Sequence, residues 1–131
     1  MPGHYRTSTD LVNEALANLG VLVAGQPANV EDFAFVNEKL DSIFRKIAAL
    51  EISWVPDPQN IPGEWFSDLA DIVAGECCTK FGVTGDDYAK LINKGLGGVQ
   101  GVDVGMGAAA KSLRQINRGR ATREILQADY F

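Results

Sequence analysis

The sequence predicts an all-α protein, a bundle of four to five helices with a Gly-rich irregular segment and an extended C-terminal arm. Two observations lead to this prediction. Apolar residues recur at steps of three and four over residues 29–50, and residues that favour helix starts and ends flank this and other apolar stretches. A chain of 131 residues is large enough for one buried core, so we expect one helical domain over residues 1–118, followed by an arm over residues 119–131.

The first expected helix covers residues 7–19. Thr7, Ser8, Thr9 and Asp10 offer N-cap side chains before a short amphipathic stretch, and Gly20 stands where a glycine ends many helices. Residues 29–50 give the strongest pattern. Asn29 and Asp32 suit a helix start, where an acceptor and acidic side chains are favourable. The apolar stripe comprises Phe33, Val36, Leu40, Ile43, Phe44, Ile47 and Leu50.

A loop is expected over residues 51–63, because Pro56, Pro58 and Pro62 exclude both a helix and a central strand. Trp54 and Ile61 give this loop apolar anchors of its own. Long loops without regular structure often contact partners. A packed crossover between antiparallel helices explains the same residues, and both interpretations remain open.

Two further helices are expected, the first over residues 64–81 and the second opening at residues 84–87. The pattern then dissolves between residues 95 and 107, where six of thirteen residues are glycine. Glycine is unfavourable inside helices, which predicts a flexible or irregular segment. Order returns at residue 108, with a final helix that Gly119 closes.

No catalytic site, cofactor site or metal site is expected from the residues. His4 is the only histidine. The sequence therefore lacks the set of ligands that a zinc site needs and a well-placed histidine base that could activate a nucleophile. The pairs Asp68–Asp71 and Asp86–Asp87 are explained as solvated or capping carboxylates. Adjacent Cys77 and Cys78 are explained as buried, reduced thiols.

Residues 105–112 approach the phosphate-binding pattern G-x-x-x-x-G-K-[ST], but Ala110 replaces its second glycine and no strong strand precedes it. A nucleotide-dependent enzyme using Lys111 is therefore a remote alternative. No apolar run reaches the roughly 20 residues that cross a bilayer, so no membrane partner is expected.

Charge divides the chain into an acidic body and a basic end. Residues 1–103 hold 7 Lys and Arg against 15 Asp and Glu, whereas residues 104–131 hold 5 against 2. Strong nonspecific binding to duplex DNA depends on neutralising phosphates, which an acidic body does not do. The end combines cations with apolar anchors, a composition typical of docking segments. The predicted docking arm comprises Arg114, Arg118, Arg120, Arg123, Ile125, Leu126, Tyr130 and Phe131.

The stretches RTSTDLVNEALANLGVL and DFAFVNEKLDSIFRKIAALEISW resemble the head-to-tail adaptors of tailed bacteriophages. These are also called head completion or tail accessory proteins, and they include the packaged-DNA stabilisation proteins of short-tailed phages. LADIVAGECCTKFGV is similar to the third helix of the family, and AAAKSLRQINRGR to its closing helix. The pattern is carried by Asp10, Leu11, Ala15, Leu16, Leu19, Gly20, Val21, Leu40 and Asp41.

The resemblance implies a virion protein without enzymatic activity, assembled in the host cytoplasm and located at the head–tail junction. It implies a ring, commonly of twelve copies, under the portal protein, with double-stranded DNA passing through the channel without sequence-specific binding. The C-terminal arm would dock on the portal. The opposite side would meet the nozzle or tail-tube proteins through a tail-side loop of Trp54, Val55, Pro56, Asp57, Pro58 and Ile61. The alternative from the residues is a small DNA-binding regulator using the basic helix 111–123.

Overall fold

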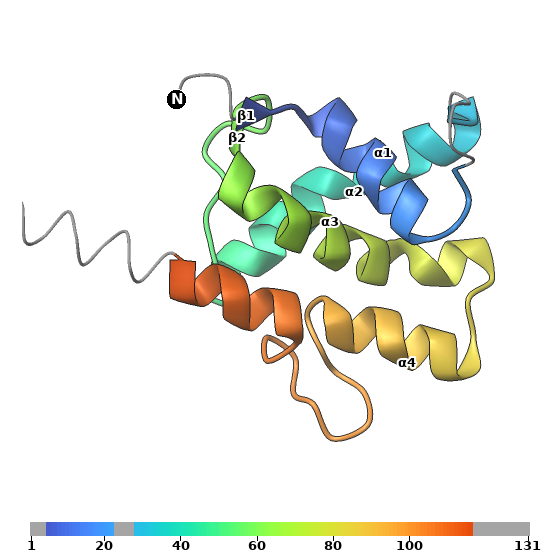
Figure 1. The fold of residues 1–131 in the computed structure, drawn as a ribbon, viewed down its shortest axis with the longest axis vertical. Coiled ribbons are helices and arrows are strands. Elements are labelled where there is room, and N and C mark those ends of the chain that lie inside the picture. Colours follow the sequence, from blue (N-terminus) through green and yellow to red (C-terminus); the bar gives the residue numbers. More distant parts are fainter. Residues whose placement is uncertain (1–4, 23–27, 117–131) are drawn as a thin grey trace, which may run out of the picture.

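The computed structural model describes residues 5–22 and 28–116, and within them the predicted all-α bundle is confirmed (Figure 1). Its helices are α1 (Ser8–Asn18), α2 (Val30–Ala49), α3 (Gly63–Cys77), the 3-10 helix η1 (Cys78–Phe81), α4 (Gly85–Lys94) and a further helical segment over residues 108–116. Two short strands, β1 (Tyr5–Arg6) and β2 (Ile61–Pro62), pair in antiparallel fashion.

The first two helices begin where the sequence predicts. Thr7 caps α1 in a capping box, because its hydroxyl accepts from the Asp10 N–H while the Asp10 carboxylate accepts from the Thr7 N–H. Asn29 caps α2 and accepts hydrogen bonds from the N–H groups of Glu31 and Asp32. Such side chains satisfy amides that have no partner inside the helix.

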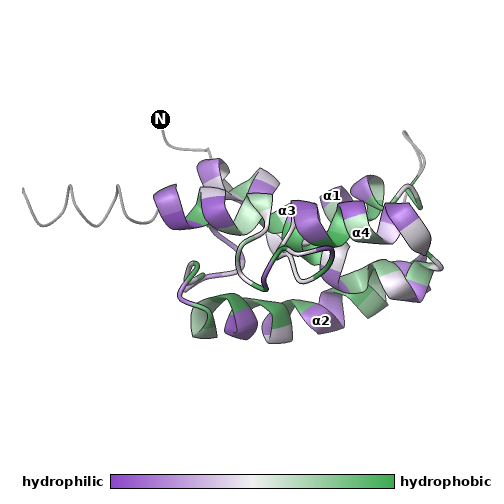
Figure 2. Cartoon of the chain, turned by 90° about the horizontal axis from the view of Figure 1, so that it is seen from below, coloured by the Kyte–Doolittle hydropathy of each residue, from purple (hydrophilic) through white to green (hydrophobic). Residues whose placement is uncertain are grey.

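Helix α3 is the centre of the bundle. It packs against α1, α2 and α4, and Leu69, Ile72 and Val73 on it are fully buried. In Figure 2, α2 lies on one side, below the other helices. The predicted stripe of α2 faces this core, with its central residues buried and its end residues Phe33 and Leu50 partly buried.

The third helix ends earlier than expected. The sequence predicts a single helix over residues 64–81, but α3 ends at Cys77 and the chain tightens into η1 before Gly82 adopts a left-handed φ of 78°. A 3-10 turn often closes an α-helix because it pairs carbonyl groups that the last turn leaves unpaired. Apolar periodicity does not distinguish the two helix types over four residues.

Glycines allow α3 and α4 to approach closely. A Cβ atom at Gly75 would lie 2.9 Å from the backbone oxygen of Leu91 in α4, and one at Gly95 would lie 2.9 Å from that of Asp71 in α3. The two backbones therefore touch where a larger residue would hold them apart. This contact holds α4 along α3, on the side of α3 away from α1 (Figure 1).

The Gly-rich segment is irregular, as predicted, but it is held by close backbone contacts. The N–H groups of Gly105 and Gly107 both donate to the carbonyl oxygen of Leu96, at 2.8 and 2.9 Å. A Cβ atom at Gly107 would lie 2.3 Å from the Gly95 oxygen. Glycine is thus required here by the narrow space between two backbone segments that cross.

Candidate interaction surfaces

Trp54 is an aromatic side chain that the described part of the structure leaves largely in solvent. It lies in the loop between α2 and α3 and is 69% exposed. Its neighbours Ser53 and Val55 are only 4% and 7% exposed, so the backbone alternation directs the indole outward while the residues beside it are buried. Glu51 at the start of the loop has a φ of 57°, a conformation uncommon for residues other than glycine.

The loop that carries Trp54 is anchored at its far end. The Asp57 carboxylate accepts from the Asn60 side chain at 2.6 Å and from the Gln59 N–H at 3.0 Å, and these bonds lower the pKa of Asp57. The Gln59 amide donates to the Ser8 hydroxyl at 2.8 Å, which ties the loop to the start of α1. The pairing of β2 with β1 adds a second link. Trp54 is therefore presented from a fixed segment.

The predicted tail-side loop divides into a buried part and an exposed part. Val55 and Ile61 belong to the hydrophobic core, with Ile61 fully buried. The exposed part comprises Trp54, Pro56, Asp57 and Pro58. The buried residues agree with a packed crossover, whereas contact of the exposed residues with a partner stays a prediction.

Of the predicted docking arm, the structure describes only Arg114. Its guanidinium donates to the Leu50 carbonyl oxygen at 3.3 Å and contacts the Met106 sulfur at 3.6 Å. Arg114 therefore joins the helical segment 108–116 to the end of α2 and to the Gly-rich segment. The other arm residues lie outside the described residues: Arg118, Arg120, Arg123, Ile125, Leu126, Tyr130 and Phe131.

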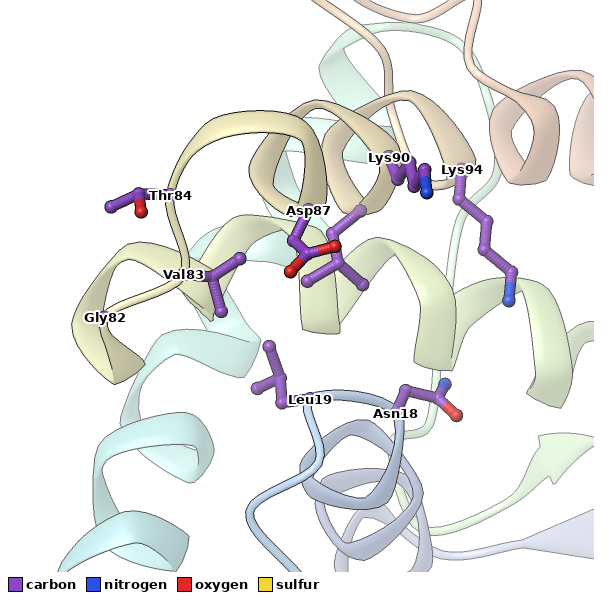
Figure 3. A pocket seen from close by; sticks show the side chains of 9 residues that line it. Asn18, Leu19, Gly82, Val83, Thr84, Asp87, Lys90 and Lys94 are labelled. Carbon is purple, nitrogen blue, oxygen red and sulfur yellow. The ribbon is translucent and has the colours of Figure 1, made fainter.

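An open groove of about 640 Å³ lies between the end of α1, residues 82–84 and one face of α4 (Figure 3). Leu19 and Val83 point toward one another across it, and the Asp87 side chain enters from α4. The groove is missed by sequence patterns because its walls come from distant segments. Its lining residues are Asn18, Leu19, Gly82, Val83, Thr84, Asp87, Lys90, Leu91 and Lys94.

A carboxylate contacts two of the residues that line this groove. Asp71 of α3 accepts from the Asn18 amide at 3.3 Å and lies 3.8 Å from the Lys94 ammonium group. Its side chain is only 15% exposed, less than expected for a solvated helix face, and burial raises the pKa of Asp71 although Lys94 opposes the shift. Because Lys94 is paired in this way, α1, α3 and α4 are joined at this end of the groove.

The described cysteines and the glycines of the segment that approaches a phosphate-binding loop make contacts within the fold. No group of three or more histidine, cysteine or acidic residues within them could hold a metal ion. Cys77 and Cys78 are buried and unbridged, and burial raises the pKa of Cys77 to about 11. In the segment that approaches a phosphate-binding loop, the amides of Gly105 and Gly107 already donate to Leu96. They are thus not available to wrap a phosphate as that motif requires.

No protein-family model, curated protein or solved structure was found to match the chain. Within residues 5–22 and 28–116, no helix combines the length and apolar character needed to span a membrane.

Proposed function

We propose that this protein is a structural head-to-tail adaptor of a tailed bacteriophage. It would form a ring under the portal protein, bridge the portal and the tail, and help to retain the packaged DNA in the virion. The observation that carries the proposal is the resemblance of the first two helical stretches to that family. Those stretches form α1 and α2, which begin at Thr7 and Asn29 caps and build the core together with α3.

The charge of the body supports a role beside DNA that must slide. Acidic side chains are exposed on several elements, and repulsion of phosphates keeps a channel wall from holding the duplex. The exposed acidic residues are Glu14, Glu31, Glu38, Asp41, Glu51, Asp57, Glu64, Asp86, Asp87 and Asp103. A regulator that grips DNA would need the opposite charge. In the described part of the segment 111–123 that such a regulator would use, Arg114 donates to the Leu50 carbonyl oxygen, which reduces what it can offer to phosphates.

The proposed contacts follow from the distribution of apolar anchors. The basic and aromatic residues of the arm, 119–131, would dock on the portal, and Pro56, Asp57 and Pro58 of the exposed loop would be available to tail proteins. Aromatic and arginine side chains dominate the binding energy of many interfaces.

Native mass spectrometry of the full chain mixed with the portal of the same phage tests the proposal. A stoichiometric ring on the portal is expected, and deletion of residues 123–131 should abolish it while the helical circular dichroism spectrum stays unchanged. The matched control is Val104→Ala, which changes an exposed apolar residue of the Gly-rich segment. Absence of portal binding by the full chain would refute the adaptor assignment, and unchanged binding by the deletion variant would refute the role of the arm.

A further inference from the structure

We propose that copies of this chain associate head to tail, with Trp54 of one copy inserted into the groove between α1 and α4 of the next. The partner is a second copy of the chain. The inference rests on the proposed function in that a ring requires a contact of this kind, and it assigns Trp54 to a neighbouring copy instead of a tail protein.

Trp54 has the properties of an interface anchor. An indole that is 69% exposed leaves a large apolar area in water, and burying an aromatic side chain of this size removes roughly 150–250 Å² from solvent. The buried neighbours Ser53 and Val55 and the bonds of Asp57 hold the loop in place, so little conformational entropy is lost when Trp54 is bound. Tryptophan is enriched among residues that contribute most to binding.

The groove is large enough to admit an indole and has apolar side chains in its lining. Its volume of about 640 Å³ falls within the range of pockets that enclose small ligands. Leu19, Val83 and Leu91 supply apolar contacts. A buried indole N–H needs an acceptor, and the Asp87 carboxylate, which points into the groove in Figure 3, supplies one.

The groove is lined by Lys90 and Lys94 as well as by Asp87, so charge complementarity with the acidic loop rests on a lysine that is not already paired. Glu51 and Asp57 are exposed on either side of Trp54 along the chain. On the rim of the groove, Lys94 is paired with Asp71, whereas Lys90 makes no ion pair with any other described residue. Lys90 is therefore the cation that can meet the acidic loop. Opposite charges across an interface favour association and fix its register.

The positions of the two surfaces determine the type of assembly. The loop lies where α2 ends and α3 begins, and the groove lies at the opposite end of the bundle, between the end of α1, residues 82–84 and one face of α4 (Figure 1). A contact between two different surfaces of the same chain is heterologous. It leaves one unused loop and one unused groove in every open oligomer, so it continues until a ring closes or a filament grows.

The test uses sedimentation velocity of the full-length protein over a range of concentrations, without a portal. The average mass of the wild type should rise with concentration. Trp54→Ala should weaken self-association at least ~30-fold, which corresponds to about 2 kcal/mol. Val83→Arg, which places a charged side chain in the groove, should do the same, whereas the control Val104→Ala should behave as wild type. Circular dichroism establishes that each variant is folded.

Mixing the two variants distinguishes this arrangement from other contacts. Trp54→Ala retains an intact groove and Val83→Arg retains an intact Trp54, so an equimolar mixture should form one-to-one dimers and nothing larger. A mixture that stays monomeric, or Trp54→Ala protein that associates as well as wild type, would overturn the proposal. So would loss of association only on deletion of residues 117–131, because the arm would then be the occupant.

A charge exchange provides a second route that leaves the core untouched. Glu51→Lys and Lys90→Glu should each weaken association, and protein carrying both changes should recover it, because the exchanged charges again face each other. Lack of recovery would contradict the proposed register. The outcomes also separate the two proposals. A wild type that stays monomeric up to ~1 mM refutes the contact, even if portal binding persists. Head-to-tail association without portal binding refutes the adaptor role alone.

Discussion

Substitution of Gly107 by alanine should destabilise the protein more than an alanine that only strains a left-handed backbone conformation. The new Cβ would lie 2.3 Å from the Gly95 oxygen and 2.5 Å from the Gly97 nitrogen, whereas ordinary contact begins at 3.4 Å. The two segments must therefore separate by about 1 Å, a shift typical of overpacked sites that cost about 1–3 kcal/mol. Both contacting atoms belong to backbone, which cannot rotate away as a side chain can.

The same shift weakens two hydrogen bonds. The Gly105 and Gly107 amides donate to Leu96 at 2.8 and 2.9 Å, and each such bond contributes about 1 kcal/mol. The expected total is about 3 kcal/mol, which would lower the melting temperature of a domain of this size by roughly 10–15 °C. Urea denaturation followed by circular dichroism measures the free energy directly.

Gly101→Ala is the matched control for this experiment. Gly101 has a φ of 83°, and no atom lies within 4 Å of the position that a Cβ would take. Alanine there tests the left-handed conformation alone, at about 1–2 kcal/mol. Gly107 has the opposite combination, a crowded site without a left-handed φ. If both variants lost the same stability, the crossing of the two backbone segments would not be the reason for Gly107.

Three further predictions concern single side chains. Asn29→Ala should lower the unfolding free energy by about 1 kcal/mol, measured from urea midpoints, and Asn29→Asp should restore most of it, because the cap of α2 needs only an acceptor. Asp71→Asn should stabilise the protein at pH 7 and have no effect below about pH 3. The pKa of Asp71 in the folded protein is raised above its ordinary value of 3.8, mainly by burial. The folded state therefore holds this proton more tightly than the unfolded state does. Stability is lost as the pH rises through the raised pKa and the carboxyl group ionises. Comparing thermal melts across this range gives the sign. Cys77, with its pKa raised to about 11, should resist iodoacetamide at about pH 8 in the folded protein and react after denaturation, as mass spectrometry would show.

Helix positions could be predicted because their signals are local. The Thr7 and Asn29 caps and the apolar stripe of α2 depend on residues within a few positions of each other, and the structure has them where the sequence places them. Helix type at residues 78–81 could not be predicted in this way. It depends on how the last turn of α3 pairs its carbonyl groups before Gly82, which periodicity does not record.

The groove and the order within the Gly-rich segment could not be predicted because both arise from contacts between distant residues. Asn18 and Lys94 lie far apart in the sequence, at the ends of α1 and α4. Both contact Asp71, because α3 lies between α1 and α4. Likewise, glycine content indicates a break in the helix at residues 95–107, but not that Gly107 packs on Gly95. The glycine content of a segment indicates that its backbone can adopt many conformations. It does not indicate which neighbouring residues restrict the backbone to one of them.

The loop after α2 could be predicted as a loop, but the exposure of its apolar residues could not. Its prolines exclude a helix, but the sequence does not say which apolar residues it buries. Val55 and Ile61 are buried and Trp54 is exposed to solvent, although all three are hydrophobic residue types that are common in protein cores. Burial of Trp54 would be favourable wherever an apolar surface could receive it. The described residues of its own chain leave Trp54 exposed, and the proposed self-association supplies the missing surface from a second copy. The proposed self-association therefore rests on the exposed indole more than on any charged or polar residue of the described chain.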